Sequence, residues 1–327
     1  MQPPINSTTK PRICILGGTG FVGQRLAAEL SSQGYPLKVL TRRRERHREL
    51  LVLPDIKLVE TDIHNQSDLS CHLNGCDIVI NLVGILNEQK KGDFEKIHAE
   101  LPGKIITACR DNDISRVIHV SALNADATKG SSDYLRTKGA GEYAFSIAGN
   151  EGLEVTILRP SVIFGPGDHF FNRFAGLLKI SPVIFPLACP NARFAPVFVG
   201  DVVHALLGCI QNPATIGEIY NLCGPNQYTL RELVEFTIDT LRTERIVIEL
   251  SDTMTQIQAK IMEKLPGKVL TTDNVLSMKS NNVCNEAFPK IFGIVPKSIE
   301  SIVPTFLLDK GQRGRYYFFR FWARHES

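Results

Sequence analysis

A glycine-rich loop between a short apolar run and a helical segment constrains this chain most. The apolar run covers residues 12–17, and helical spacing of apolar residues begins at Phe21. Gly17, Gly20 and Gly23 follow one another at intervals of three. In such a loop the first glycine turns the chain out of the strand, the second lets backbone N–H groups approach a pyrophosphate, and the third allows close helix packing. The spacing predicts a dinucleotide-binding loop; the alternative is a glycine-rich turn without a ligand.

The first half of the chain alternates between apolar runs and helical segments. Strands rich in Val, Ile and Leu on both faces belong to parallel sheets covered by helices. We therefore predict an α/β fold, a Rossmann-type doubly wound parallel sheet with a smaller C-terminal substrate lobe. The expected strands are residues 12–17, 37–41, 56–60, 77–84, 116–122 and 155–160, and the helices between them include 94–112 and 134–149.

The regular alternation weakens after Pro160, where Gly and Pro begin to punctuate the chain. We predict an NAD(P)-binding domain over 11–160, a smaller lobe interleaved with the sheet over 161–308, and a basic, aromatic tail over 309–327. Within the smaller lobe, Thr229 is followed three residues later by Glu232, which is the spacing of a capping box at a helix start.

Composition and charge limit the partners and the cellular location that can be expected of the protein. The net charge of +3 gives no case for a nucleic-acid partner. The eight cysteines form no C-x-x-C pair and several lie in apolar runs, so we predict reduced core cysteines, with neither a disulfide framework nor a metal site. The N-terminus lacks the apolar core of a secretory signal, and no apolar run is long enough to cross a membrane. We expect a cytoplasmic protein, at most peripheral to the inner face of a membrane.

The end of the second expected strand bears on the choice of cofactor. NAD-binding enzymes place an acidic residue about 20 residues past the glycines, on the ribose 2′-hydroxyl. This chain has Arg42, Arg43 and Arg44 there, and no acidic residue before Glu45. A guanidinium pairs well with a 2′-phosphate, so NADP(H) is favoured over NAD(H). Not every arginine of this run can reach one phosphate, and the others are expected to be solvated.

Several motifs resemble those of the extended, or atypical, short-chain dehydrogenases, the NAD-dependent epimerase/dehydratase superfamily. They are GGTGFVG (17–23), TDI (61–63), NLVG (81–84), YLRTK (134–138) and LRPSVIFGPGD (158–168). A narrower likeness, carried by DNVLSMKSNNV (273–283) and FGIVPKSIESIVP (292–304), is to the branch of the complex I nucleotide-binding accessory subunit and its bacterial relatives. Together these stretches span about residues 12 to 306.

The resemblance implies a role for each matching residue. Pyrophosphate would lie on the three glycines, 2′-phosphate on Arg42, adenine beside the TDI motif and ribose beside the NLVG motif. The implied cofactor residues are Gly17, Thr19, Gly20, Phe21, Val22, Gly23, Arg42, Asp62, Ile63, Leu82, Val83, Gly84 and Lys138.

Tyr134 and Lys138 match the family's Y-x-x-x-K pattern. At a spacing of four residues on a helix they share one face. A nearby ammonium lowers the high pKa of a tyrosine, so Tyr134 would move a proton while the cofactor moves a hydride. Ser121, at the end of an expected strand, is the candidate third catalytic residue. The alternative is that Lys138 and its helix only position the nucleotide.

Two functions from different classes follow. The first is an NADP(H)-holding protein of the complex I accessory-subunit type. The second is an active oxidoreductase, epimerase or dehydratase acting on a nucleotide-sugar, isoprenoid-like or quinone-related substrate. For such a substrate, Asn172 and Arg193 occupy places where epimerase-like relatives put binding groups.

The tail is the last distinctive segment. Residues 313–324 place six aromatic residues between Tyr316 and Trp322, among four arginines. Rings with cations suit a membrane interface or a protein partner such as a respiratory complex. The alternative is a tail that folds back and buries its rings on the body of the protein.

Overall fold

A seven-stranded parallel sheet forms the centre of the computed structural model, which describes residues 10–265 and 267–308. The strand order is β11-β6-β5-β4-β1-β2-β3, and each neighbouring pair is parallel. The predicted α/β doubly wound fold is therefore confirmed. The strands are β1 (Ile13–Leu16), β2 (Leu37–Thr41), β3 (Ile56–Glu60), β4 (Ile78–Asn81), β5 (Arg116–Val120), β6 (Glu154–Pro160) and β11 (Ile219–Leu222).

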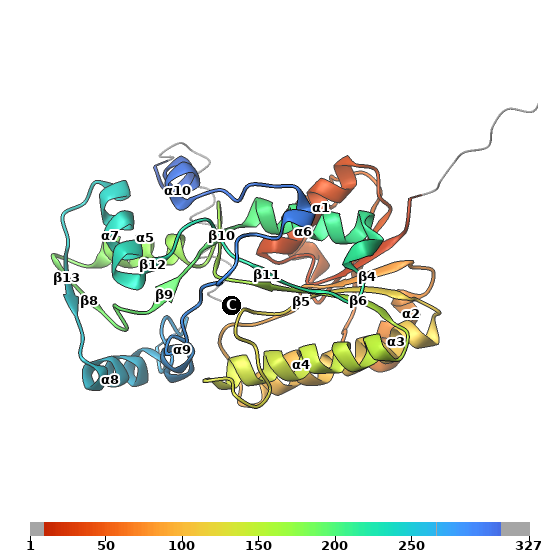
Figure 1. Cartoon of the computed structure of the whole chain (residues 1–327), viewed down its shortest axis with the longest axis horizontal. Helices are drawn as coiled ribbons and strands as arrows, with labels where there is room; N and C mark the ends of the chain where they lie inside the picture. The colour runs from red at the N-terminus through yellow and green to blue at the C-terminus, as the bar shows by residue number, and fades with distance from the viewer. Residues whose placement is uncertain (1–9, 266, 309–327) are drawn as a thin grey trace, which may run out of the picture.

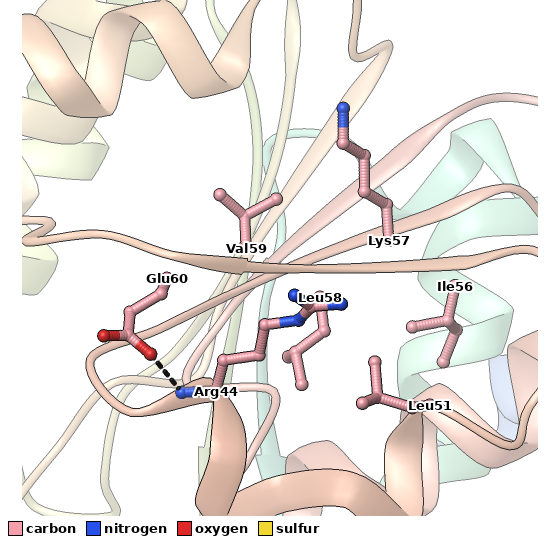
Figure 2. Close-up of a pocket in the computed structure, with 7 residues that line it drawn as sticks. All are labelled: Arg44, Leu51, Ile56, Lys57, Leu58, Val59 and Glu60. Carbon is pink, nitrogen blue, oxygen red and sulfur yellow. Dashed lines mark hydrogen bonds between the residues drawn. The ribbon is translucent and has the colours of Figure 1, made fainter.

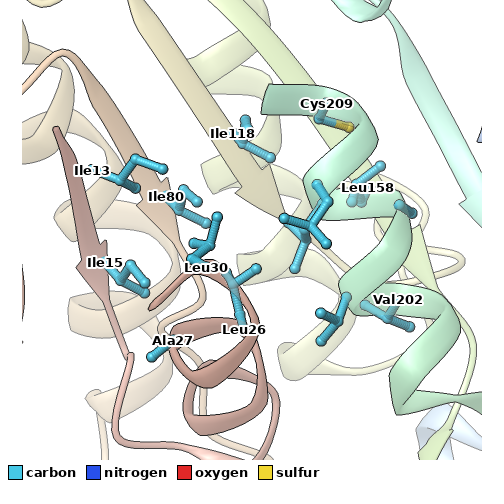
Figure 3. Packing of buried hydrophobic residues seen from close by; sticks show 14 of the residues in the cluster. Ile13, Ile15, Leu26, Ala27, Leu30, Ile80, Ile118, Leu158, Val202 and Cys209 are labelled. Atoms are coloured by element: carbon cyan, nitrogen blue, oxygen red, sulfur yellow. The ribbon is translucent and has the colours of Figure 1, made fainter. Parts of the chain in front are cut away.

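Helices cover both faces of the sheet (Figure 1). One layer holds α1 (Phe21–Ser32) and α6 (Val199–Gln211), and the other holds α2 (Gln66–Leu73), α3 (Leu101–Asp111) and α4 (Asp133–Asn150). Figure 3 shows the first interface, where Leu26 and Leu30 of α1 and Val202 of α6 meet isoleucines of the sheet. All residues of β1 and β4 are buried, as expected of strands that are apolar on both faces.

The expected helix 94–112 differs from the prediction in its first turns. A π-helical segment, η2 (Glu95–Glu100), precedes α3. Pro102 has no N–H to donate to the carbonyl of His98 four residues earlier. Helix α4 packs closely on this carbonyl, since a Cβ on Gly141 would lie 2.0 Å from the His98 oxygen. The freed carbonyl and the close contact explain why the helix widens here.

The smaller lobe packs α5 (Phe171–Ile180), α7 (Leu230–Leu241) and α10 (Ile299–Leu307) around a second apolar core. Thr229 and Glu232 form the predicted capping box at the start of α7. Three two-stranded sheets complete it: β7 (Ile163–Phe164) with β10 (Val197–Phe198), β9 (Arg193–Phe194) with β12 (Tyr228–Thr229), and β8 (Ile184–Leu187) with β13 (Ile246–Glu249). Helices α8 (Asp252–Met262) and α9 (Thr272–Ser277) follow. Among the described residues, no helix combines the length and apolar character needed to cross a membrane.

The prediction that all cysteines are reduced is wrong for one pair. Cys223 and Cys284 form a disulfide with their Cα atoms 6.0 Å apart. Cys223 directly follows the edge strand β11, and Cys284 lies seven residues after the end of α9. Their 61-residue separation hides the pairing from any spacing rule. The cysteine pattern consequently no longer supports a reducing compartment. Four others, Cys14, Cys76, Cys109 and Cys209, are free and buried.

Candidate functional site

The glycine loop leaves β1 at the carboxyl edge of the sheet and is packed tightly against its surroundings. Gly17 has a φ of +77°, and a Cβ there would lie 2.9 Å from the backbone of Leu82. The N–H of Gly20 donates to the Gly17 carbonyl at 3.0 Å. A Cβ on Gly23 would lie 2.4 Å from the same carbonyl oxygen. The turn and the close helix approach that the spacing predicts are both present.

The start of α1 is open to an anion. Its N-cap, Gly20, provides no side-chain hydrogen bond, and its first turn contains no acidic residue. The first N–H groups of a helix have no partner within the helix and carry partial positive charge. Beside them, the carbonyl of Thr19 accepts a hydrogen bond from Gln24, and Val22 packs into the core. The ring of Phe21 lies 5.7 Å from the guanidinium carbon of Arg25.

Two arginines of the run after β2, Arg42 and Arg44, are held differently. The backbone N–H of Arg44 donates to Glu60 at the end of β3, 2.7 Å away. Figure 2 shows the Arg44 side chain lying beside Leu58, where it lines a hollow of about 470 Å³ on the outer strand. Arg42 is exposed, and its side chain has no hydrogen bond or ion pair with any other described residue. Arg42 is therefore available for a ligand, whereas Arg44 covers β3.

The motifs after β3 and β4 lie along the same edge. Asp62 is exposed and accepts a hydrogen bond from the N–H of His64, while the side chain of Ile63 packs against the core. Parallel register places the ends of β1, β2, β3 and β4 side by side. The structure thus brings together the loops that the sequence assigned to pyrophosphate, 2′-phosphate, adenine and ribose.

The loop after β4 reaches the Y-x-x-x-K helix. Val83 donates its N–H to Asn81 at 3.1 Å. A Cβ on Gly84 would lie 4.0 Å from the Lys138 Nζ. Lys138 is buried and donates to the Val120 carbonyl at 2.8 Å. Burial lowers the pKa of Lys138 to about 8.

Tyr134 lies one helical turn before Lys138 and packs against two rings. Its ring centroid is 5.5 Å from that of His98 and 5.9 Å from that of Phe94. Burial and, to a smaller extent, the carboxylate of Asp273 together raise the pKa of Tyr134 to about 12. Its hydroxyl has no hydrogen-bond partner among the described residues. In this arrangement the phenol is held neutral, which is unfavourable for a general base.

Ser121 lies directly after β5 and is buried. Its Oγ has no hydrogen-bond partner among the described residues. Two positions earlier on the same strand, His119 contacts Asn81 through its Nδ1 at 3.1 Å, and its Nε2 is also buried without a described partner. Unpartnered buried polar atoms are costly, and two of them lie here at the end of β5.

Asn172 and Arg193 are the two residues predicted to bind a substrate. Among the described residues, neither forms a hydrogen bond, ion pair or ring contact with Tyr134. The N–H and the side-chain amide of Asn172 both donate to Asp168 at the start of α5. Asp168 is fully buried, which raises its pKa to about 6. Arg193 is exposed on β9. Hydrogen bonds from Thr229 lower the pKa of Glu232, and the charge of Arg193 adds to this lowering.

Two residues of this region were missed by sequence reasoning. His98 accepts a hydrogen bond from the N–H of Ile85 at 3.1 Å, and burial lowers its pKa to about 3. No motif marks this histidine. Asp273 caps the start of α4 from the smaller lobe, and its signal was its place in the DNVLSM segment.

Comparison with known proteins identifies the family. The model of the NAD dependent epimerase/dehydratase family matches residues 13–223. The chain belongs to the NAD dependent epimerase/dehydratase family. The resemblance read from the motifs is thereby confirmed, and the matched region of this epimerase/dehydratase chain includes the glycine loop, Arg42, Tyr134 and Lys138.

Relatives of this epimerase/dehydratase chain differ in what they do. NADH dehydrogenase [ubiquinone] 1 alpha subcomplex subunit 9, mitochondrial, of Mus musculus is 31% identical over 228 residues, 68% of this chain. The aligned part spans 59% of that relative's length. A ceramide reductase of Caulobacter vibrioides is 29% identical over 204 residues, 62% of this chain and 61% of the reductase.

A solved structure shares the fold. The NADPH-dependent quinone oxidoreductase QOR2 of Escherichia coli, complexed with NADPH, superposes with a TM-score of 0.72 at 17% identity and covers 91% of this chain and 100% of its own.

Proposed function

We propose that this protein holds a nicotinamide dinucleotide at the carboxyl edge of its sheet and prefers NADP(H) to NAD(H). The observation that carries the proposal is the pairing of two features: the uncapped start of α1 behind the glycine loop, and the exposed Arg42 guanidinium at the end of β2. The first suits a pyrophosphate and the second a 2′-phosphate. Family membership supports the dinucleotide; the arginine supports the phosphate.

Each part of the nucleotide has its own group of residues in this proposal. The pyrophosphate lies over Gly17, Gly20 and the first turn of α1. Adenine lies beside Asp62 and Ile63. The nicotinamide ribose lies between the loop at Gly84 and the ammonium of Lys138, which has donors left after its bond to Val120.

Titration of the purified protein with both nucleotides tests the preference. We expect NADPH to bind at least tenfold more tightly than NADH, because only NADPH offers a 2′-phosphate to Arg42. Equal affinity, or tighter binding of NADH, would overturn the preference for NADP(H). Lys138→Ala is expected to weaken binding of both nucleotides, because the ribose contact exists in the bound state whether or not the protein turns over.

We propose that the protein binds the nucleotide without turning over a substrate, because of the surroundings of Tyr134. A tyrosine that acts as a general base needs a lowered pKa, whereas burial and Asp273 raise that of Tyr134. The alternative, an NADP-dependent oxidoreductase, epimerase or dehydratase, is supported by retention of Tyr134 and Lys138 and by the reductase relative. Incubating the NADPH-loaded protein with quinone, isoprenoid-like and nucleotide-sugar substrates distinguishes the two. Turnover that Tyr134→Phe abolishes would establish the alternative.

We also propose that the protein meets a membrane surface or a respiratory-complex partner through its tail. The support is the similarity to a NADH dehydrogenase subunit and the basic, aromatic composition of residues 313–324, which lie outside the described residues. Cosedimentation with anionic vesicles and with membrane fractions, comparing the full chain with one ending at Lys310, tests it. Salt-sensitive binding that the shortened chain loses is expected. The folded-back tail would instead be indicated if the full chain bound neither the vesicles nor the membrane fractions and the shortened chain had a lower thermal stability.

A further inference from the structure

A segment of the smaller lobe crosses the carboxyl edge of the sheet. We call residues 268–282 the strap; it contains α9. Hydrogen bonds join it to the loops that follow β4, β5 and β6, and Figure 1 shows its path. At its start, the Lys268 Nζ donates to the carbonyl of Glu88 at 2.5 Å, and the side chain of Asn87 donates to the Lys268 carbonyl at 2.9 Å. These contacts hold in place the loop that begins with Gly84, which we propose lies beside the nicotinamide ribose.

The middle of the strap caps the helix that bears Tyr134 and Lys138. The two carboxylate oxygens of Asp273 accept the N–H groups of Asp133 at 2.7 Å and Tyr134 at 3.3 Å. The next N–H of α4 donates to the Oγ of Ser132, which is also 2.7 Å from the Oγ of Ser277. The first turn of α4 is therefore completed by a side chain from 140 residues further along the chain.

Burial and the nearby carboxylate of Asp133 raise the pKa of Asp273, whereas the hydrogen bonds from the N–H groups of Asp133 and Tyr134 favour its charged form. A carboxylate is favoured at the positive end of a helix, and charged acceptors make stronger hydrogen bonds than neutral ones. Asparagine has the same shape but no charge, and its NH₂ group would replace one of the two carboxylate oxygens that accept from the Asp133 and Tyr134 N–H groups. Removal of the charge therefore loosens the strap without creating a cavity.

We propose that Asp273 is a positioning residue that couples docking of the strap to nucleotide binding. The inference rests on the proposed function, because the strap contacts two parts of the proposed nucleotide site. These are the loop after Gly84 and the helix that bears Lys138. When the strap is docked, both sides of the proposed ribose site are held in place. Coupling of this kind is reciprocal: if the strap favours the nucleotide, the nucleotide stabilises the docked strap by the same factor.

Asp273→Asn in the full chain tests the coupling, with Asp239→Asn as the matched control. Asp239 is exposed on α7, and its side chain has no partner among the described residues. We expect the Asp273 variant to bind NADPH about tenfold more weakly, and the control to bind like the wild type. Hydrogen exchange of peptides 131–138 and 268–282 should slow when NADPH binds the wild type. In the Asp273 variant this protection should be lost.

The possible results separate the coupling from the function. Wild-type affinity in the Asp273 variant, or strap exchange that NADPH leaves unchanged, would overturn the coupling alone. Lack of NADPH and NADH binding by the wild type would overturn the proposed function and the coupling together. If the Asp273 variant were less stable but bound NADPH with unchanged affinity, Asp273 would only cap the helix, and this result would also overturn the coupling. If Asp273→Asn does not fold, Ser277→Ala removes one hydroxyl contact with Ser132 and must weaken NADPH binding in the same direction.

Discussion

Arg42 and Lys138 carry the chemistry of the proposed site as single side chains, one exposed and one buried. Arg42→Ala removes a guanidinium that no other described residue engages, so the body of the protein should be unaffected. We expect NADPH to lose a charge-assisted contact of about 1.5–3 kcal/mol, while NADH affinity stays nearly constant. Parallel fluorescence titrations measure both. Arg44→Ala is the matched control, and an equal loss there would place the phosphate elsewhere.

Lys138 should leave a signature in the pH dependence of stability. Because burial lowers its pKa to about 8, the folded state gives up this proton more readily than the unfolded state. The cost of the buried charge is full below pH 8 and disappears as the pH rises towards the ordinary value of about 10.4. Relative to Lys138→Met, the wild type should therefore gain stability between pH 7 and pH 9.5.

Urea unfolding of both proteins across that range checks the sign. Lys129→Met is the control, because Lys129 is an exposed lysine near the same helix. Its stability difference from the wild type should stay constant. A constant difference for Lys138→Met as well would mean that Lys138 titrates as a solvated lysine.

At the scale of elements, the β1–loop–α1 unit depends on close backbone approach. In Gly23→Ala the new Cβ would meet the Gly17 oxygen at 2.4 Å and the Gly18 Cα at 2.5 Å. The loop must open, so we expect the variant to lose nucleotide affinity and to be destabilised by at least about 1–3 kcal/mol. Calorimetric titration and thermal unfolding measure the two effects.

Gly103→Ala provides the comparison. It lies inside α3 with nothing within 4 Å of a new Cβ, and alanine there should stabilise the helix by about 0.8–1 kcal/mol while nucleotide affinity stays unchanged. If Gly23→Ala behaved in the same way, the helix would not be packed on the loop as the structure has it.

At the scale of the whole molecule, the disulfide joins the segment that follows the strap, at Cys284, to the end of the edge strand β11, at Cys223. Opening a loop of this length by Cys223→Ser should lower the free energy of unfolding by about 2–4 kcal/mol. Urea unfolding with and without a reductant measures the loss, and the reductant should act on the wild type but not on the variant. Cys71→Ser, at an exposed free cysteine, should behave like the wild type in both conditions. If the reductant left the free energy of unfolding of the wild type unchanged, this would contradict the pairing of Cys223 with Cys284.

The sequence alone was sufficient for six strands of the sheet, the glycine loop and the family. These features are local: buried parallel strands are apolar throughout, and a loop that turns out of a strand onto a helix needs glycine at set positions. Capping at Thr229 followed from the same kind of short-range rule. Arg42 could be singled out because it lies a fixed distance past the glycines.

Contacts between distant segments were decided only by the tertiary structure. Cys223 meets Cys284, and Asp273 meets Tyr134, across 61 and 139 residues. His98 is indistinguishable in sequence from a surface histidine until α4 closes over it, and the pKa of Tyr134 depends on which side chains bury it. Local patterns specify the backbone because they act within a turn or a strand. Burial and charge at the site arise from elements that fold together from far along the chain, and no spacing in the sequence records them.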